Sequence, residues 1–420
     1  MRRSVSWWLT AFVSASVAVS LGAGCQRSES KEAASAAPSE QKSAAPAAAE
    51  LQEIKLGQVM PYSGPASAYG TIGRLESAYF AMINRKGGVN GRKINLISLD
   101  DSYSPPKAVE QVRKLVEQDK VLAIVNPVGT PSNTAIRKYL NDRQVPHLFL
   151  STGASKWNDP KNYPWTMGFN PSYRLEGRTY AEHILKTLPK SKVAVLYQAD
   201  DFGKDLLAGL KDGFGDKAAS KIVAEATYEV TDATIDSQLV SLKGSKADVV
   251  VLITTPKFGA QAVRKTEDLG WKATRYIANV STSVGSVLVP AGLDKAKGLI
   301  TVEYVKDPTD PRWTDDPAMK EWYAFMKSEY PSGDTRDGFN AFAYVVAQTL
   351  VHVLTQCGDD LSPKNLMKQA ASLKDFAPPM LLPGVKMNTS DTDFATFDQL
   401  HLARFDGQTW AQLEGESASR

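Results

Sequence analysis

The 420-residue sequence has very few of the side chains that build covalent cross-links and metal centres. It contains two cysteines, Cys25 and Cys357, and four scattered histidines. Two cysteines provide neither a disulfide framework nor a thiolate metal site, and no two histidines have the spacing of metal ligands. We therefore expect neither a metal ion nor a cofactor.

An excess of charge is also absent. The sequence has 49 Lys and Arg against 46 Asp and Glu, a net charge of +3. A chain so close to neutrality has no global attraction for nucleic acid or for an anionic membrane. Hydrophobic residues make up 43% and charged residues 23%, which is typical of a soluble globular protein and excludes a polytopic membrane protein. At about 150 residues per domain, the length predicts two or three folding units.

The motifs of common enzyme classes are a third absence. The sequence has no G-x-S-x-G nucleophile elbow, no G-x-x-x-x-G-K-[ST] phosphate loop and no H-E-x-x-H zinc motif. The acidic pairs Asp100–Asp101 and Asp200–Asp201 could serve acid–base chemistry, but acidic residues at such positions more often cap helix N-termini. We predict that the protein is not an enzyme.

The first fifty residues have the composition of a targeting segment and a tether. Residues 1–24 combine a positive start with an apolar stretch, which is typical of a secretory signal peptide. The segment ends Leu-Gly-Ala-Gly-Cys at Cys25, which resembles the lipobox of bacterial lipoproteins. We therefore predict lipidation of Cys25 and a membrane-anchored protein in the periplasm, with ordinary cleavage nearby as the alternative. Residues 25–50 are rich in Ala, Ser, Glu, Lys and Pro, so we predict a disordered tether.

From Leu51 onward, short β-branched runs alternate with amphipathic stretches. We predict strands at residues 54–60, 94–99, 121–125, 193–197, 222–230, 249–253 and 275–278. We predict helices at residues 69–85, 106–118, 131–140, 204–210, 235–242, 258–269, 319–330, 339–354 and 365–373. This alternation indicates two doubly wound α/β lobes with largely parallel sheets. The late helices need a surface to pack on, so we expect the chain to cross between the lobes more than once.

Three loops that follow predicted strands are rich in Ser, Thr, Gly and aromatic residues. They cover residues 61–70, 127–132 and 151–157. Hydroxyls and backbone N–H groups at helix N-termini form a neutral anion site that suits a carboxylate, and aromatic rings beside them add apolar contact. The alternative is that these Ser and Thr residues only cap helices.

At these loops the sequence resembles the leucine/isoleucine/valine-binding proteins of branched-chain amino-acid ABC transporters, which have the type I periplasmic-binding-protein fold. The resemblance runs from Ile54 to Trp410. Its most specific segments are IKLGQVMPYSGPASAYG from Ile54, GGVNGRKI from Gly87, DD at Asp100, KAVEQVRKLV from Lys107 and AVLYQADDFGKD from Ala194.

The resemblance implies two lobes that are joined by three hinge crossovers and close on a small carboxylate ligand. On this basis lobe 1 comprises residues 51–171 and 304–383, and lobe 2 comprises residues 172–303 and 384–420. It also implies a monomer that delivers its ligand, a branched-chain or other amino acid, to the permease subunits of an ABC importer.

The resemblance implies roles for several loop residues. Tyr69 would pack on the ligand, Thr130, Gly153 and Ser155 would hold its α-carboxylate, and Phe202 would line the cleft from lobe 2. The neighbouring or corresponding positions complete the candidate ligand-binding set: Ala154, Trp157, Tyr173, Thr255, Asn279 and Ser281.

The sequence departs from the family where acidic residues would pair an α-ammonium group. Residues 170–173 and 278–281 are not acidic, and a buried ammonium without an acceptor would be costly. Either Asp200, Asp201 or Glu303 replaces them, or the ligand is an aromatic or aliphatic organic acid without an amine. A ligand-sensing receptor module is a further alternative to transport.

Overall fold

The computed structural model describes residues 53–419, so the predicted signal peptide, the tether and Cys25 lie outside the described residues. The first sheet has five strands, all parallel, in the order β2-β1-β3-β4-β5. The strands are β1 (Ile54–Met60), β2 (Ile94–Asp100), β3 (Ala123–Val125), β4 (His147–Leu150) and β5 (Thr166–Gly168). β1 is buried at six of its seven positions, because helices cover both faces of the sheet.

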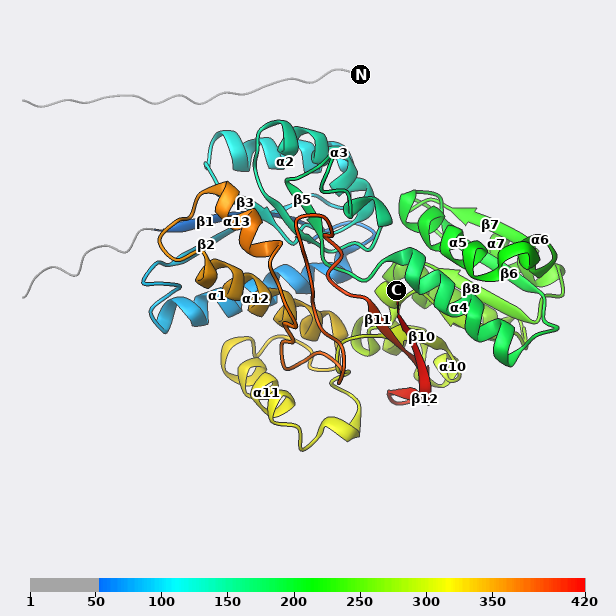
Figure 1. The fold of residues 1–420 in the computed structure, drawn as a ribbon. Coiled ribbons are helices and arrows are strands. Elements are labelled where there is room, and N and C mark those ends of the chain that lie inside the picture. The colour runs from blue at the N-terminus through cyan, green and yellow to red at the C-terminus, as the bar shows by residue number, and fades with distance from the viewer. Residues whose placement is uncertain (1–52, 420) are drawn as a thin grey trace, which may run out of the picture. The chain divides into compact units, whose positions relative to one another are not determined.

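The helices of this first lobe lie in two layers. Figure 1 shows α2 (Pro105–Glu117) and α3 (Thr130–Asp142) on one side of the sheet, and α1 (Gly70–Arg85) and α12 (Gly338–Gln356) on the other. α11 (Pro317–Glu329) and α13 (Pro363–Ala370) complete the lobe by packing beside α1 and α12. The late helices therefore pack on the first lobe, as the sequence predicted.

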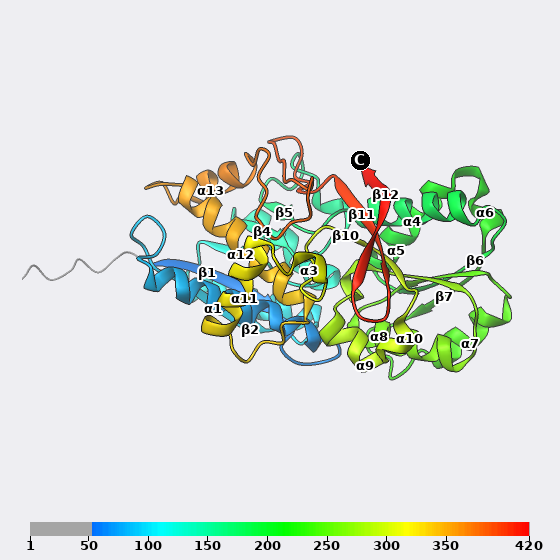
Figure 2. The same cartoon turned by 90° about the horizontal axis from the view of Figure 1, so that it is seen from below.

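The second sheet has seven strands in the order β12-β11-β10-β9-β8-β6-β7. The strands are β6 (Val193–Gln198), β7 (Ile222–Tyr228), β8 (Val249–Ile253), β9 (Thr274–Ile277), β10 (Ile300–Glu303), β11 (Gln399–Phe405) and β12 (Trp410–Ser419). In Figure 2, α4 (Tyr173–Thr187) lies on one side of these strands, and α7 (Asp236–Gly244) and α8 (Pro256–Asp268) lie on the other. α5 (Asp201–Phe214) packs against α4 and β6.

The chain passes between the two sheets three times. It leaves the first sheet after β5, returns after β10, and crosses again between α13 and β11. The predicted fold of two doubly wound lobes is confirmed. The prediction of largely parallel sheets needs one addition, because β11 and β12 form an antiparallel hairpin on β10. The residue boundaries assigned above to each lobe stay a prediction.

Both sheets share one strand order, in which the second strand lies outside the first and the third lies on its other side. The connections therefore diverge between β1 and β3, and between β6 and β8. Ligands of open α/β sheets bind outside the carboxyl ends of strands at such switch points.

α12 is long and apolar enough to cross a membrane, judged by length and composition alone. Most of it is nevertheless buried inside the protein. The ring of Tyr344 in α12 packs against Tyr79 of α1 at 5.1 Å and against Phe325 of α11 at 5.1 Å between ring centroids. It is a core helix of the first lobe.

Candidate functional site

A cavity lies between the loops at the carboxyl ends of the two sheets. The space between its lining atoms is about 860 Å³, part of it open to solvent. Its wall comes from the first-sheet loops, the second-sheet loops, the crossover after β10 and the N-terminus of α12. Residues from both lobes therefore contribute to one site.

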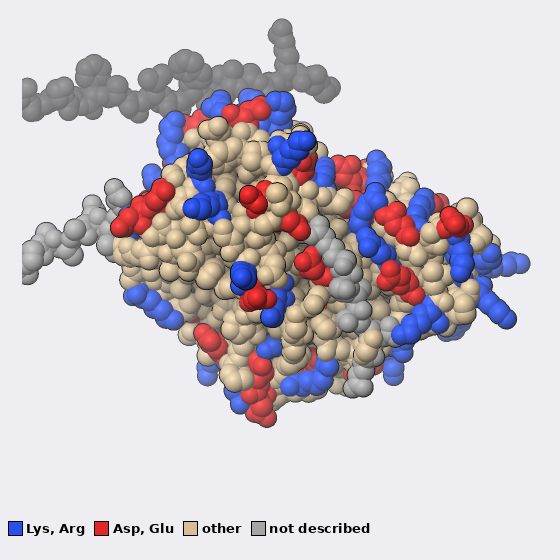
Figure 3. Space-filling view, viewed as in Figure 1, with Lys and Arg blue, Asp and Glu red and all other residues tan. Residues whose placement is uncertain are grey.

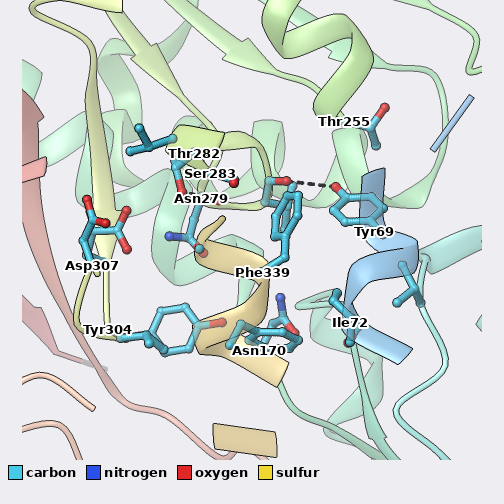
Figure 4. Close-up of a pocket in the computed structure, with 18 of the residues that line it drawn as sticks. Tyr69, Ile72, Asn170, Thr255, Asn279, Thr282, Ser283, Tyr304, Asp307 and Phe339 are labelled. Atoms are coloured by element: carbon cyan, nitrogen blue, oxygen red, sulfur yellow. Dashed lines mark hydrogen bonds between the residues drawn. The ribbon is translucent and has the colours of Figure 1, made fainter. Parts of the chain in front are cut away.

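Most of the wall is apolar and aromatic. The rings of Tyr69 and Phe339 lie 5.0 Å apart, and Figure 4 shows Phe339 between Tyr69 and the loop that carries Asn279 and Thr282. The Tyr69 hydroxyl donates to the Val280 carbonyl at 2.9 Å, so an aromatic residue of lobe 1 is bonded to a loop of lobe 2 (Figure 4). Further apolar contact area comes from Ile72, Val128, Val284, Tyr304, Phe342 and Trp410.

One end of the cavity is acidic. Glu303, the last residue of β10, and Asp307, four residues later, both line the wall. Burial raises the pKa of Glu303 well above its usual range, and the charge of Asp307 raises it further. Burial also raises the pKa of Asp307, although hydrogen bonds from the Thr309 N–H and hydroxyl oppose this.

The described residues that line the cavity offer no free basic group to balance these carboxyls. Among the described residues that line it, Lys306 is the only Lys or Arg. The Lys306 Nζ atom lies 2.8 Å from the carboxylate of Asp316, so its charge is already paired. A ligand cation at this end would find two acidic partners and no competing cation.

The structure brings six of the predicted site residues into the cavity wall: Tyr69, Thr130, Tyr173, Phe202, Thr255 and Asn279. It places the other five outside this wall: Gly153, Ala154, Ser155, Trp157 and Ser281. Trp157 is buried and its indole N–H donates to the Thr152 hydroxyl at 3.2 Å. Ser281 is also buried, and its hydroxyl donates to the Thr254 carbonyl.

The three acidic residues that could replace the missing ammonium partners differ in position. Asp200 caps α5 by accepting from the backbone N–H groups of Phe202 and Gly203 at 3.0 and 3.3 Å. Asp201 forms an ion pair with Lys156 at 2.5 Å. Of the three, only Glu303 lines the cavity.

Sequence reasoning missed Asp307, Tyr103, Tyr304 and Phe339, which all line the cavity. A signal existed for two of them, because Tyr304 and Asp307 follow a short β-branched run at residues 300–303, the position where ligand residues gather in open sheets. That run was not recognised as a strand.

Charge on the surface is evenly mixed. In the view of Figure 3, Lys and Arg are interspersed with Asp and Glu over the two lobes, and no broad area of one sign is visible on that face. In residues 53–419, no group of three or more His, Cys, Asp or Glu side chains is arranged to hold a metal ion. The interlobe cavity is therefore the best candidate for a binding site in the described part of the chain.

Comparison with known proteins identifies the family. The periplasmic binding protein family matches residues 53–409. A curated relative, the Leu/Ile/Val-binding protein homolog 7 of Brucella abortus, is 26% identical over 355 residues, covering 80% of this chain and 84% of the relative.

Two solved structures show the same fold. A branched-chain amino-acid ABC transporter protein from Thermus thermophilus with bound valine superposes with a TM-score of 0.76 at 16% identity, over 86% of this chain and 96% of that one. The fatty acid ABC transporter substrate-binding protein of Thermomonospora curvata superposes with a TM-score of 0.70 at 19% identity, over 87% and 93% of the two chains.

Proposed function

Because the chain belongs to the periplasmic binding protein family, we propose that it is the solute-binding component of an ABC importer and captures a small apolar ligand with a cationic amino group. The family binds solutes and is not a family of enzymes, as the sequence predicted. The observation that carries the choice of ligand is the pair Glu303 and Asp307 at one end of an apolar cavity.

The acid pair suits an ammonium group on physical grounds. Without a ligand, burial and the charge of Asp307 disfavour the ionised form of Glu303 and raise its pKa. An ammonium group beside both carboxyls would favour their ionised forms, so binding would release a proton. The apolar body of the ligand would then contact the rings of Tyr69, Phe339 and Phe342.

The contribution of both lobes to the cavity wall supports a transport role. A ligand that contacts both lobes stabilises the arrangement in which the lobes meet, and that population shift is what a permease can recognise. We propose a monomer that delivers its ligand to ABC permease subunits from the periplasm. The predicted lipid anchor at Cys25 would hold it at the membrane, with conventional signal cleavage as the alternative.

The named relatives support two ligand classes. The Leu/Ile/Val-binding homolog and the valine-bound structure favour ligands with an amine. The fatty acid-binding structure matches the alternative of an amine-free acid. The acidic end of the cavity favours the first class here, because the charge of Asp307 would repel a ligand carboxylate.

Thermal unfolding of the purified, ligand-stripped and refolded protein tests the proposal. The panel pairs two amine-bearing ligands, leucine and 3-methylbutylamine, with the amine-free 4-methylpentanoate. At 100-fold over its dissociation constant, a ligand adds about 2.7 kcal/mol of stability, which raises the melting temperature by several degrees. We expect a shift with at least one amine-bearing ligand and none with 4-methylpentanoate.

Two variants connect the shift to the acid pair. Glu303→Gln keeps the shape of the side chain and removes its charge, so it should abolish the shift. Glu321→Gln changes an exposed residue of α11 and should leave the shift unchanged. A shift with 4-methylpentanoate alone would overturn the proposal in favour of an importer of organic acids.

A further inference from the structure

We infer that the cleft selects ligands whose cationic nitrogen carries methyl groups, and that Trp410 is the residue that recognises this nitrogen. The inference rests on the proposed function and names the substrate class of the same site. It starts from the C-terminal hairpin, because the turn between β11 and β12 brings Trp410 into the cavity wall at its acidic end.

Two hydrogen bonds fix Trp410 between other residues of the wall. Its backbone N–H donates to Asp307 Oδ2 at 3.3 Å, and its indole N–H donates to the Thr282 carbonyl at 2.9 Å. Asp307 and Thr282 both line the cavity. Trp410 is also buried and packs on Phe405, with 5.3 Å between the ring centroids. The indole is therefore held in one place at the acidic end of the cavity.

A second ring of the wall, Tyr304, is held in a similar way. It packs on Phe397 with 5.0 Å between the ring centroids. In Figure 4 its ring points from the side of Asp307 towards Asn170. Among the described residues, no Lys or Arg side chain lies over the ring of Tyr304 or Trp410. The protein itself therefore places no cation on these two rings.

Asp307 provides this end of the cavity with charge more than with free hydrogen-bond acceptors. The Thr309 N–H donates to its Oδ1 atom at 2.9 Å. Three further groups donate to its Oδ2 atom: the hydroxyls of Thr309 and Thr409, at 2.9 and 3.4 Å, and the Trp410 N–H. A carboxylate oxygen has about two lone pairs. A ligand N–H group would therefore compete with these donors for Oδ2.

A methylated cation complements these features better than a primary ammonium group. A primary ammonium carries three N–H donors, and a donor that leaves water without gaining an acceptor costs free energy. A trimethylated nitrogen keeps the positive charge and has no N–H donor. Its methyl groups can lie against the rings of Trp410 and Tyr304, which is how aromatic side chains bind quaternary ammonium groups. Asp307 supplies the opposite charge.

Calorimetric titration of the ligand-stripped full protein compares two pairs of ligands that differ only in methylation of the nitrogen. One pair is 3-methylbutylamine and its N,N,N-trimethyl derivative, and the other is leucine and its N,N,N-trimethyl derivative. In each pair that binds, we expect the methylated member to bind at least about five-fold more tightly. A smaller gain, or a loss, would overturn the inference and leave the proposed function standing. Binding of none of the four would overturn both.

Variants of Trp410 test the residue directly through the ratio of the two affinities within a pair. Trp410→Leu removes the ring and should lower this ratio to below about two-fold. Trp410→Phe keeps a ring that binds cations less strongly and loses the indole N–H, so it should lower the ratio at least about two-fold. Trp165→Leu, at a half-buried position outside the cavity wall, is the matched control.

The ratio compares two ligands on the same protein, so a general loss of stability does not change it. An unchanged ratio in either folded variant of Trp410 would contradict its assigned role.

Discussion

Glu76 is a carboxyl group buried in the middle of the first lobe. Gln58 donates to one of its oxygens at 2.5 Å and Asn126 donates to the other at 2.6 Å. Asn126 in turn accepts from Ser151, which lines the cavity. Burial raises the pKa of Glu76 to about 8, and the two hydrogen bonds oppose that shift only in part. Glu76 therefore supports the cavity wall, and the free energy needed to bury its carboxyl group depends on pH.

The ionisation of Glu76 should make the free energy of unfolding depend on pH. The folded protein holds the Glu76 proton up to about pH 8, whereas the unfolded chain releases it near its ordinary pKa of 4.5. This contribution to stability is complete below about pH 4.5 and is lost as the pH rises towards 8. Between pH 5 and pH 7 the free energy of unfolding should fall by roughly 3 kcal/mol through this group.

Urea unfolding across this pH range, compared between the wild type and Glu76→Gln, isolates the effect. Glu176 and Glu303 also have raised pKa values and act in the same direction, so the difference between the two proteins is the relevant quantity. Glu321→Gln, on the exposed side of α11, serves as the control. Parallel curves for the wild type and Glu76→Gln would show that Glu76 is ionised in the folded protein at neutral pH.

Single residues also show how far the site could be predicted from the sequence. Tyr69 was identified because it lies in a distinctive loop, and Glu303 was one of three open alternatives. The contact between Asp205 and Ser155 could not be predicted in the same way. Asp205 meets Ser155 across 50 residues of chain and between two lobes, and no local pattern encodes such a pairing. Loop positions indicate which residues gather, but packing decides which of them remain free.

At the scale of elements, α4 and α5 illustrate how glycine sets helix packing. A Cβ atom at Gly177 of α4 would lie 2.2 Å from the Leu206 carbonyl oxygen, and one at Gly209 of α5 would lie 2.3 Å from the Arg174 carbonyl oxygen. The two helices thus approach backbone to backbone. Any side chain at either position would force them apart.

Gly177→Ala should therefore destabilise the protein despite the higher helix propensity of alanine. Overpacking against backbone atoms should cost about 2 kcal/mol or more, measured as the free energy of unfolding in urea. The control is Gly244→Ala at the end of α7, where a Cβ atom meets nothing within 4 Å. That variant should stay within about 0.5 kcal/mol of the wild type. Equal effects of the two substitutions would contradict the close approach of α4 and α5.

The sequence analysis missed α4 and the β11–β12 hairpin, and the structure shows why. α4 carries Gly177 in its interior, which weakens its helical signal, and its packing on α5 overrides that weakness. The β11–β12 hairpin has a local signal in Asp406-Gly407, a dipeptide typical of tight turns. Its place in the sheet has no such signal, because β11 pairs with β10 about 100 residues earlier. Elements with strong periodicity, such as β1 and α1, were predicted nearly to their ends.

At the scale of the whole molecule, the lobes meet through side chains as well as through three crossings of the chain. Asp337 caps the N-terminus of α12 and accepts from Ser283 and Ser286 of lobe 2 at 2.7 and 2.5 Å. Ser283 and Phe339, on either side of this contact, both line the cavity. The same contact therefore holds the lobes together and shapes the ligand site.

Ser286→Ala should uncouple part of this contact while leaving the helix cap intact, since Phe339 and Ser283 still donate to Asp337. Loss of one hydrogen bond to a carboxylate should destabilise the joined arrangement of the lobes by about 1.5–3 kcal/mol. A ligand that needs both lobes then binds at least about ten-fold more weakly.

Titration with 3-methylbutylamine measures this loss of affinity in Ser286→Ala. Small-angle scattering should show a larger radius of gyration that saturating ligand restores, and Ser328→Ala, exposed on α11, should change neither quantity. Unchanged affinity and scattering in Ser286→Ala would mean that the three crossings alone fix how the lobes meet, so that ligand binding selects no separate state.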